Sequence, residues 1–127
     1  MIVRSREDVQ ASGAFAEKAG VWSSARYLLQ SDEVGFTLTM TTVAAGQRLE
    51  LEYQNHIEAN LIIEGGARLT DVEADRSYDL GVGDMYALDK NDRHILEALS
   101  DLKLVCVFLP ALSGSETHDS SGSYAEA

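Results

Sequence analysis

Two segments carry most of the information in this chain: GQRLELEYQNHIEANLIIEGG (residues 46–66) and LGVGDMYALDKNDRH (residues 80–94). Apolar and polar residues alternate in both, as in strands that bury one face, and Gly and Asp turn signals bound them. Glu58, Tyr86 and His94 come from three separate predicted strands, each close to a turn signal. If the strands close into a barrel, these three side chains can converge inside it.

The same alternation extends in both directions along the chain. It predicts strands over residues 22–30, 35–43, 48–55, 58–64, 67–73, 77–80, 84–88, 93–98 and 102–108. Residues 1–5 also alternate and predict a short strand. A helical turn is predicted over residues 6–10, capped by Ser5 with Asp8 at its third position, whereas residues 11–20 fit no single pattern. Many short strands with almost no helix indicate an all-β barrel or sandwich.

Length and composition predict one domain over residues 1–127, with a strand and turn region (1–20), a barrel (21–110) and a tail (111–127). Asp and Glu number 21 against 10 Lys and Arg, a net charge of -11, and so acidic a surface repels nucleic acid. Cys106 is the single cysteine, which favours a reducing compartment. No apolar run approaches the roughly 20 residues of a membrane helix. We expect a cytoplasmic protein with neither nucleic acid nor membrane as a partner.

Spacing around Glu58 matches the two metal-bearing segments of a small cupin barrel. Gly46, Glu58 and Gly65 stand at the glycine, glutamate and glycine positions of the first segment, and residues 81–83 begin the second. Three positions that usually carry histidine have other residues, which are Glu52, Gln54 and Tyr86. The spacing therefore favours a cupin fold more strongly than the side chains favour a metal.

Two interpretations of Glu58, Tyr86 and His94 stay open at this point. In the first, they bind one metal ion, and a carboxylate, a phenolate and an imidazole suit iron. Three protein ligands would leave positions for substrate or water. In the second, the barrel has lost its metal, and the three are a hydrogen-bonded carboxylate, a core aromatic and a strand-end residue. The cupin spacing favours the first.

The chain resembles the ectoine synthase family of cupin enzymes along almost its whole length. The matching segments are MIVRS (1–5), WSSARYL (22–28), GF (35–36), TT (41–42), YQNHIEA (53–59), IEG (63–65), YALDK (86–90), DRH (92–94), LVCVF (104–108) and the pattern L-x-G-x-E-x-H-D-x-x-G-x-Y (112–124). The segment around YALDK and the tail are the most specific of these.

The resemblance implies a cupin barrel that acts as an iron-dependent, homodimeric, cytoplasmic hydro-lyase. Such enzymes close N-γ-acetyl-L-2,4-diaminobutyrate into the compatible solute ectoine with loss of water, the last step of osmolyte biosynthesis. The family's iron ligands fall on Glu58, Tyr86 and His94. Its substrate-pocket residues fall on Trp22, Arg26, Thr41, Tyr53, His56, Cys106, Phe108, Glu116 and His118.

Within that pocket the resemblance and the chemistry together predict roles. Tyr53, His56, Glu116 and His118 are the acid–base candidates, Arg26 or Thr41 would hold the substrate carboxylate, and Trp22 and Phe108 would shape the substrate. Cys106 is expected to be pocket wall, because no basic residue lies near it in sequence. Taken alone, Tyr53 and His56 equally fit a hydrogen-bonded core pair, and Arg26 a solvated strand residue.

The chain departs from the family's usual pattern at several positions. Asn60-Leu61-Ile62 replaces an aromatic and a cysteine, Thr39-Met40 replaces a His or Asp, Glu52 replaces a His before Tyr53, and residues 66–68 differ from the usual turn. These departures concern substrate range and efficiency more than fold.

Three functions therefore stay open: the hydro-lyase, a cupin that binds a small solute without turnover, and a metal cupin for another acetylated diamine. In the first, the tail closes over the barrel mouth as a lid.

Overall fold

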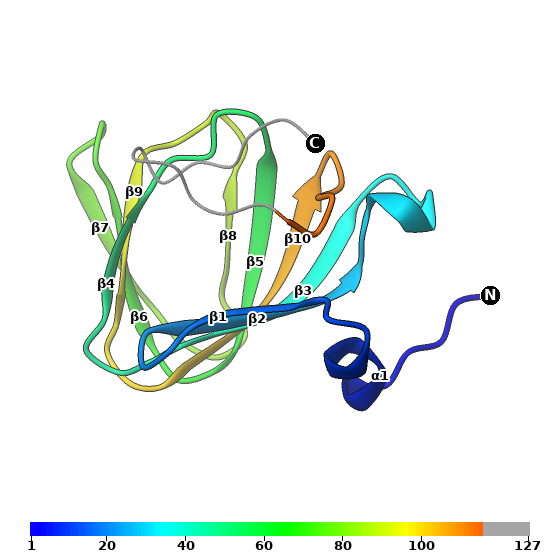
Figure 1. The fold of residues 1–127 in the computed structure, drawn as a ribbon. Helices are drawn as coiled ribbons and strands as arrows, with labels where there is room; N and C mark the ends of the chain where they lie inside the picture. The colour runs from blue at the N-terminus through cyan, green and yellow to red at the C-terminus, as the bar shows by residue number, and fades with distance from the viewer. Residues whose placement is uncertain (116–127) are drawn as a thin grey trace.

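The computed structural model describes residues 1–115, which form two antiparallel sheets that curl around a shared interior (Figure 1). The strands are β1 (Phe15–Lys18), β2 (Trp22–Leu28), β3 (Thr37–Val43), β4 (Arg48–Leu51), β5 (Ile57–Glu64), β6 (Ala67–Asp71), β7 (Arg76–Leu80), β8 (Met85–Leu88), β9 (His94–Ala98) and β10 (Leu102–Leu109). The larger sheet has the order β1-β2-β3-β10-β5-β8 and the smaller one β4-β9-β6-β7. The all-β barrel expected from the alternation is confirmed.

Alternation along the strands sets the interior. On β10, Leu102, Leu104, Cys106 and Phe108 are buried, while the residues between them face outward. Successive side chains on a strand point to opposite faces, so each buried position aligns with a buried position on its neighbours. Leu104 thus lies opposite Ile62 of β5, which is also fully buried, and the register of the whole wall follows from this pattern.

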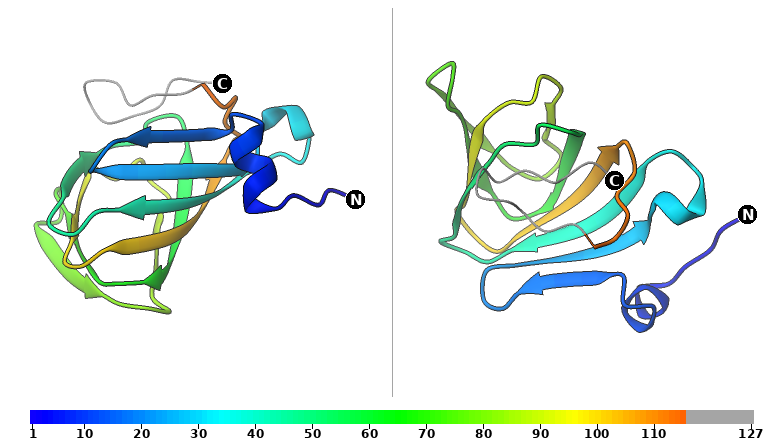
Figure 2. Two further views of the ribbon diagram at one scale, coloured as in Figure 1. Left: turned by 60° about the horizontal axis from the view of Figure 1, so that its bottom comes forward. Right: turned by 45° about the horizontal axis from the view of Figure 1, so that its top comes forward.

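The predicted helical turn is present as α1 (Arg6–Ala11), and its cap is the predicted one. The Ser5 hydroxyl accepts from the Asp8 amide at 3.0 Å, and the Asp8 carboxylate accepts from the Ser5 amide at 2.8 Å. This reciprocal pair satisfies two amides that a helix start leaves unbonded. Val9 is buried and anchors the helix on β2 at the side of the barrel (Figure 2).

The prediction for the first five residues is wrong. Residues 1–5 form no strand in the described structure, and Figures 1 and 2 show the N-terminal segment running away from the barrel. Alternation alone does not make a strand, because the main chain also needs a partner to pair with. The unassigned stretch 11–20 contains β1, which pairs with β2, and the strands predicted over 22–30 and 48–55 end at Leu28 and Leu51.

Gly65 is required where the β5–β6 turn packs on the β9–β10 turn. Its φ is +79°, and a Cβ there would overlap the main-chain oxygen of Asp101. The neighbouring Gly66 amide donates to the Ser100 hydroxyl at 3.0 Å. A side chain at Gly65 would therefore separate two turns that hold the closed end of the barrel together.

The chain leaves β10 along the edge of β3 and β2, at the opposite end of the barrel. The Leu112 amide donates to the Thr37 hydroxyl at 2.8 Å, and the Gln30 amide donates to the Leu112 carbonyl at 2.8 Å. Leu112 is fully buried. These contacts fix the start of the tail beside the barrel mouth. Residues 116–127 of the predicted lid (111–127) lie outside the described residues, so the lid stays a prediction. No helix in the described part of the chain is long and apolar enough to span a membrane.

Candidate metal centre and active site

Two rows of inward-facing side chains cross the large sheet near the barrel mouth. The first row, from β3 to β8, is Thr37, Phe108, Glu58 and Leu88. The second, from β2 to β8, is Arg26, Thr39, Cys106, Asn60 and Tyr86. The second row is mostly polar, yet Arg26, Thr39, Cys106 and Asn60 are each at most 3 % exposed. A barrel interior this polar is unusual for a packed core and typical of a binding site.

Glu58 lies in the first row. None of the ion pairs within residues 1–115 involves its carboxylate. Burial raises the pKa of its carboxyl from 4.5 to about 8, and the neighbouring Asn60 amide opposes that rise. A buried carboxylate is costly unless a positive charge compensates for it. The position therefore suits a metal ion better than it suits an uncompensated carboxylate.

Tyr86 and His94 lie next to each other across the barrel, with ring centroids 6.4 Å apart. Burial, followed by the charges of Glu58 and Cys106, raises the pKa of Tyr86 well above its ordinary value of 10. Because Glu58 acts on Tyr86 and Tyr86 contacts His94, the structure gathers all three candidate ligands in one region.

The orientation of His94 matches that of a metal ligand. Its Nδ1 lies 2.9 Å from the carbonyl oxygen of Asp92, which can only accept, so Nδ1 carries the proton and Nε2 the lone pair. Nε2 is buried and has no hydrogen-bond partner within residues 1–115. Burial also lowers the pKa of His94, which keeps the imidazole neutral near pH 7. A carbonyl behind Nδ1 is how metal-binding imidazoles are usually held.

These residues fit a metal only if the phenolate takes part. No group of three His, Cys, Asp or Glu side chains in residues 1–115 is arranged to hold a metal ion. A three-ligand site here must therefore include Tyr86 along with Glu58 and His94. Carboxylate, phenolate and imidazole are hard to borderline donors, which suits iron.

Three aromatic side chains line the region beside the candidate ligands. The Tyr53 ring lies 6.1 Å from His94 and 5.4 Å from Phe108, and the His56 ring lies 6.1 Å from Phe108. Tyr53 is 4 % exposed and His56 is 1 % exposed. The structure thus brings two of the four acid–base candidates, Tyr53 and His56, to this region, where both contact Phe108.

Cys106 lies at the centre of the second row, flanked by Thr39 and Asn60. Burial, followed by the Glu58 charge, raises the pKa of its thiol to about 12, although the Thr41 and Thr39 hydroxyls oppose the rise. A thiol that stays protonated is a poor nucleophile. The chemistry of Cys106 is therefore that expected of a pocket wall and not of a nucleophile.

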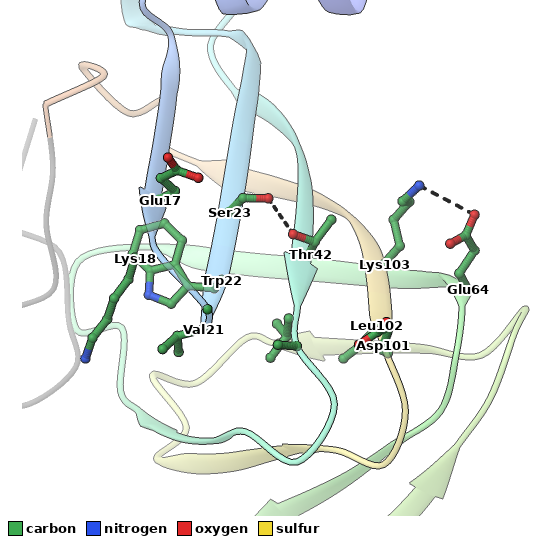
Figure 3. Close-up of a pocket in the computed structure, with 13 residues that line it drawn as sticks. Glu17, Lys18, Val21, Trp22, Ser23, Thr42, Glu64, Asp101, Leu102 and Lys103 are labelled. Carbon is green, nitrogen blue, oxygen red and sulfur yellow. Dashed lines mark hydrogen bonds and ion pairs between the residues drawn. The ribbon is translucent and has the colours of Figure 1, made fainter.

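Arg26 and Trp22 lie farther from the candidate ligands. The Arg26 guanidinium donates to the Gly114 carbonyl at 2.9 Å, so it also secures the start of the tail. Trp22 begins β2 four residues earlier, roughly 13 Å along the strand at about 3.3 Å per residue. It lines a pocket of about 420 Å³ at the closed end of the barrel (Figure 3), whose described lining residues include none of the candidate ligands. Figure 3 shows Trp22 and Lys18 on one side of this pocket and the Lys103–Glu64 ion pair on the other.

A second pocket, of about 300 Å³, is lined in part by the candidate ligands Tyr86 and His94. It lies among β6, β7 and β8, and Asp71, Asp89 and Asp92 contribute to its lining. Sequence reasoning missed this acidic approach because its residues come from separate turns. The two remaining acid–base candidates, Glu116 and His118, lie outside the described residues.

The model of the family described as ectoine synthase matches residues 1–127. The chain belongs to the ectoine synthase family. It is 42% identical over 124 residues to an L-ectoine synthase of Sphingopyxis alaskensis, covering 98% of this chain and 90% of that protein. It is 43% identical to an L-ectoine synthase of Oceanobacillus iheyensis, covering 98% and 96%.

Solved structures support the same assignment. The crystal structure of ectoine synthase from P. lautus superposes with a TM-score of 0.87 at 38% identity, covering 96% of this chain and 87% of that one. A cupin superfamily protein from Desulfitobacterium hafniense superposes with a TM-score of 0.60 at 19% identity, which bears on the fold alone. The predicted cupin fold and the resemblance to the ectoine synthase family are both confirmed.

Proposed function

We propose that this member of the ectoine synthase family is an iron-dependent hydro-lyase that converts N-γ-acetyl-L-2,4-diaminobutyrate into ectoine. Family membership supports ectoine synthesis. The observation that carries the chemistry is the buried Nε2 of His94, which has no hydrogen-bond partner among the described residues, beside Tyr86 and the buried Glu58. That set would have little reason to be buried together in a barrel that only packs a core.

Glu58, Tyr86 and His94 would hold the iron, and their chemistry fits it. Bound iron would act as a Lewis acid toward the acyl oxygen of the substrate. Asp71, Asp89 and Asp92, in the pocket that reaches Tyr86 and His94, place negative charge along a route by which a cation can approach.

The reaction joins two ends of one molecule and releases water. The neutral α-amine attacks the acetamide carbon, a C–N bond forms, the C–O bond breaks, and the oxygen leaves with two protons as water. Two protons must leave the nitrogens as the C=N bond forms, and two must reach the departing oxygen. The Tyr53 and His56 rings both contact the Phe108 ring, so both are acid–base candidates for a substrate held close to that ring.

Ring closure also requires a curled substrate. The flexible chain loses much of its entropic barrier if the protein holds the amine and the acyl carbon close together. Phe108 and Leu88, in the row that contains Glu58, supply an apolar wall for the methylene groups. The Arg26 guanidinium belongs to the second row and suits a carboxylate, so a role at the substrate carboxylate is compatible with its position. Thr41 stays an alternative for that carboxylate.

Turnover of a different acetylated diamine is the second candidate function, and a specific observation favours it. Two departures from the family pattern, Thr39 and Asn60, face the interior on either side of Cys106. Changes at inward positions alter what the pocket holds. A barrel that binds a solute without turnover would need no acid–base residues, such as Tyr53 and His56, in the region of the buried Glu58.

The deciding experiment supplies anaerobic protein with iron(II) and N-γ-acetyl-L-2,4-diaminobutyrate and follows ectoine by NMR. Ectoine formation by the unmodified chain, its loss in Glu58→Ala and co-purification of iron with the unmodified chain alone are the expected results. Parallel incubations with acetylated ornithine and lysine test the second candidate. Absence of any cyclic product, with equal metal content in both proteins, would refute the proposal in favour of a binding protein.

We also propose a cytoplasmic homodimer. The outer face of the large sheet exposes Ile57, Leu61, Met85 and Leu109, each more than 40 % exposed. Apolar side chains gathered on one sheet face are typical of an interface between subunits. β8 is also an open edge of that sheet, which a second chain could cover. The single Cys106, buried and free, supports a reducing compartment.

A further inference from the structure

We propose that Asn60 is a substrate-binding residue, whose amide donates a hydrogen bond to the acyl oxygen that the reaction removes. The identity of that substrate rests on the proposed function. Asn60 lies in residues 60–62, a segment where the chain departs from its family's usual pattern.

The hydrogen bonding of Asn60 is incomplete. The residue is 2 % exposed, and its Nδ2 has no hydrogen-bond partner of normal geometry in residues 1–115. The Glu58 carboxyl lies close enough for the amide to lower its pKa, and it can engage one of the two N–H groups. At least one N–H is therefore left over. Buried donors without an acceptor are rare and costly, and their occurrence in an interior of this kind indicates a ligand oxygen.

The place of Asn60 in its row indicates which oxygen it meets. The row carries Arg26 and Thr39 at one end and Asn60 and Tyr86 at the other, with Cys106 between. Neighbouring strands lie about 4.8 Å apart, so the main chains of β2 and β5 are separated by roughly 14 Å, a distance that their side chains shorten. Even when it is curled for ring closure, the substrate keeps its carboxylate and its acetamide on different sides, so the two groups can face different members of the row. With the carboxylate toward Arg26, the acetamide falls beside Asn60.

The hydrogen bond from Asn60 would stabilise charge that develops during ring closure. Negative charge builds on the acyl oxygen as the amine attacks, and a donor already aimed at that oxygen stabilises the charge without having to reorganise. When the C–O bond breaks, the oxygen departs as water. Ectoine retains the carboxylate and both nitrogens but lacks this oxygen, so Asn60 distinguishes substrate from product.

The test compares Asn60→Leu with Ile62→Val, a conservative change two residues along the same face of β5. In Asn60→Leu we expect kcat for N-γ-acetyl-L-2,4-diaminobutyrate to fall about 100-fold, the usual loss for one such donor. Affinity for ectoine, measured calorimetrically, should stay within about two-fold, because the product lacks the contacted oxygen. The iron content should not change. The Tm of the ligand-free variant should equal or exceed that of the unmodified protein, because an unsatisfied donor has been removed.

Three results would overturn the inference: an unchanged kcat, a loss of ectoine affinity as large as the loss of kcat, or a loss of bound iron in parallel with activity. The last would make Asn60 a support for Glu58. Asn60→Ala repeats the comparison if the Leu variant does not fold. If the unmodified chain forms no ectoine, the proposed function itself fails; turnover by the unmodified chain with an unaffected Asn60→Leu rejects the role of Asn60 alone.

Discussion

Replacing Glu58 by Gln should stabilise the metal-free protein at high pH and leave it almost unchanged at low pH. Burial raises the pKa of Glu58 from 4.5 to about 8, so the folded state holds a proton that the unfolded state releases between those values. The stability that this group contributes is therefore fully present below its unfolded pKa and is lost as the pH rises through about 8. The whole loss corresponds to about 3–5 kcal/mol.

The assay is urea unfolding followed by circular dichroism, in the presence of a chelator, from about pH 5 to about pH 9. His94, whose pKa burial lowers, contributes the opposite pH dependence, but it is present in both proteins and cancels in their difference. Near pH 5 the two proteins should agree within about 1 kcal/mol. Above pH 8 the Gln variant should be more stable by about 3–5 kcal/mol, or about 10–20 °C in Tm.

Adding iron(II) at high pH provides the counterpart. A cation compensates for the ionised carboxylate, so the unmodified protein should gain stability on metal binding while Glu58→Gln gains much less. The difference in stability between the unmodified protein and Glu58→Gln should then become smaller or change sign. Identical pH slopes for the two metal-free proteins would refute the reasoning, because the burial of Glu58 would then carry no cost.

Three further predictions concern the fold and the assembly. Gly65→Ala should lower the free energy of unfolding by about 2 kcal/mol or more. Gly66→Ala, whose Cβ meets only an ordinary contact at 3.5 Å, should lower it by less than about 1 kcal/mol. Urea titration measures both, and equal losses would contradict the overlap at Gly65. Thr37→Val removes the acceptor of the Leu112 amide and should cost about 1–3 kcal/mol in the same assay, with no loss arguing that this contact is weak. Leu61→Glu places a charge on the exposed apolar face and should convert the dimer into a folded monomer by light scattering; an unmodified protein that is already monomeric would exclude the dimer.

The strands could be predicted because their signal is local. A strand that buries one face repeats every two residues, and turn residues mark its ends, so each of the nine predicted strands overlaps an observed one. The Ser5–Asp8 cap was equally readable, since both partners lie within one helical turn. The strand predicted over residues 1–5 is absent, and β1 lies in a stretch for which the sequence predicts no element, because these short segments lack a decisive local signal. Whether a short extended segment is a strand depends on a partner elsewhere in the chain.

Only part of the candidate site could be predicted from the sequence. Spacing to neighbouring glycines picked out Glu58 and Tyr86. Asn60 passed unnoticed as a functional residue, although alternation from Glu58 places it on the same face. No rule of spacing says that Nδ2 of an asparagine will lack an acceptor, because that depends on what the facing strands bring to within about 3 Å of it.

The order of residues along the chain was sufficient for the β-rich fold, the helix cap and membership of the ectoine synthase family, because each is written in short-range patterns. Tertiary structure alone decided that Nε2 of His94 has a free lone pair, that the Glu58 carboxyl is costly to ionise and that Trp22 lies at the closed end of the barrel. Those properties depend on which distant strands meet, and on how completely they exclude water.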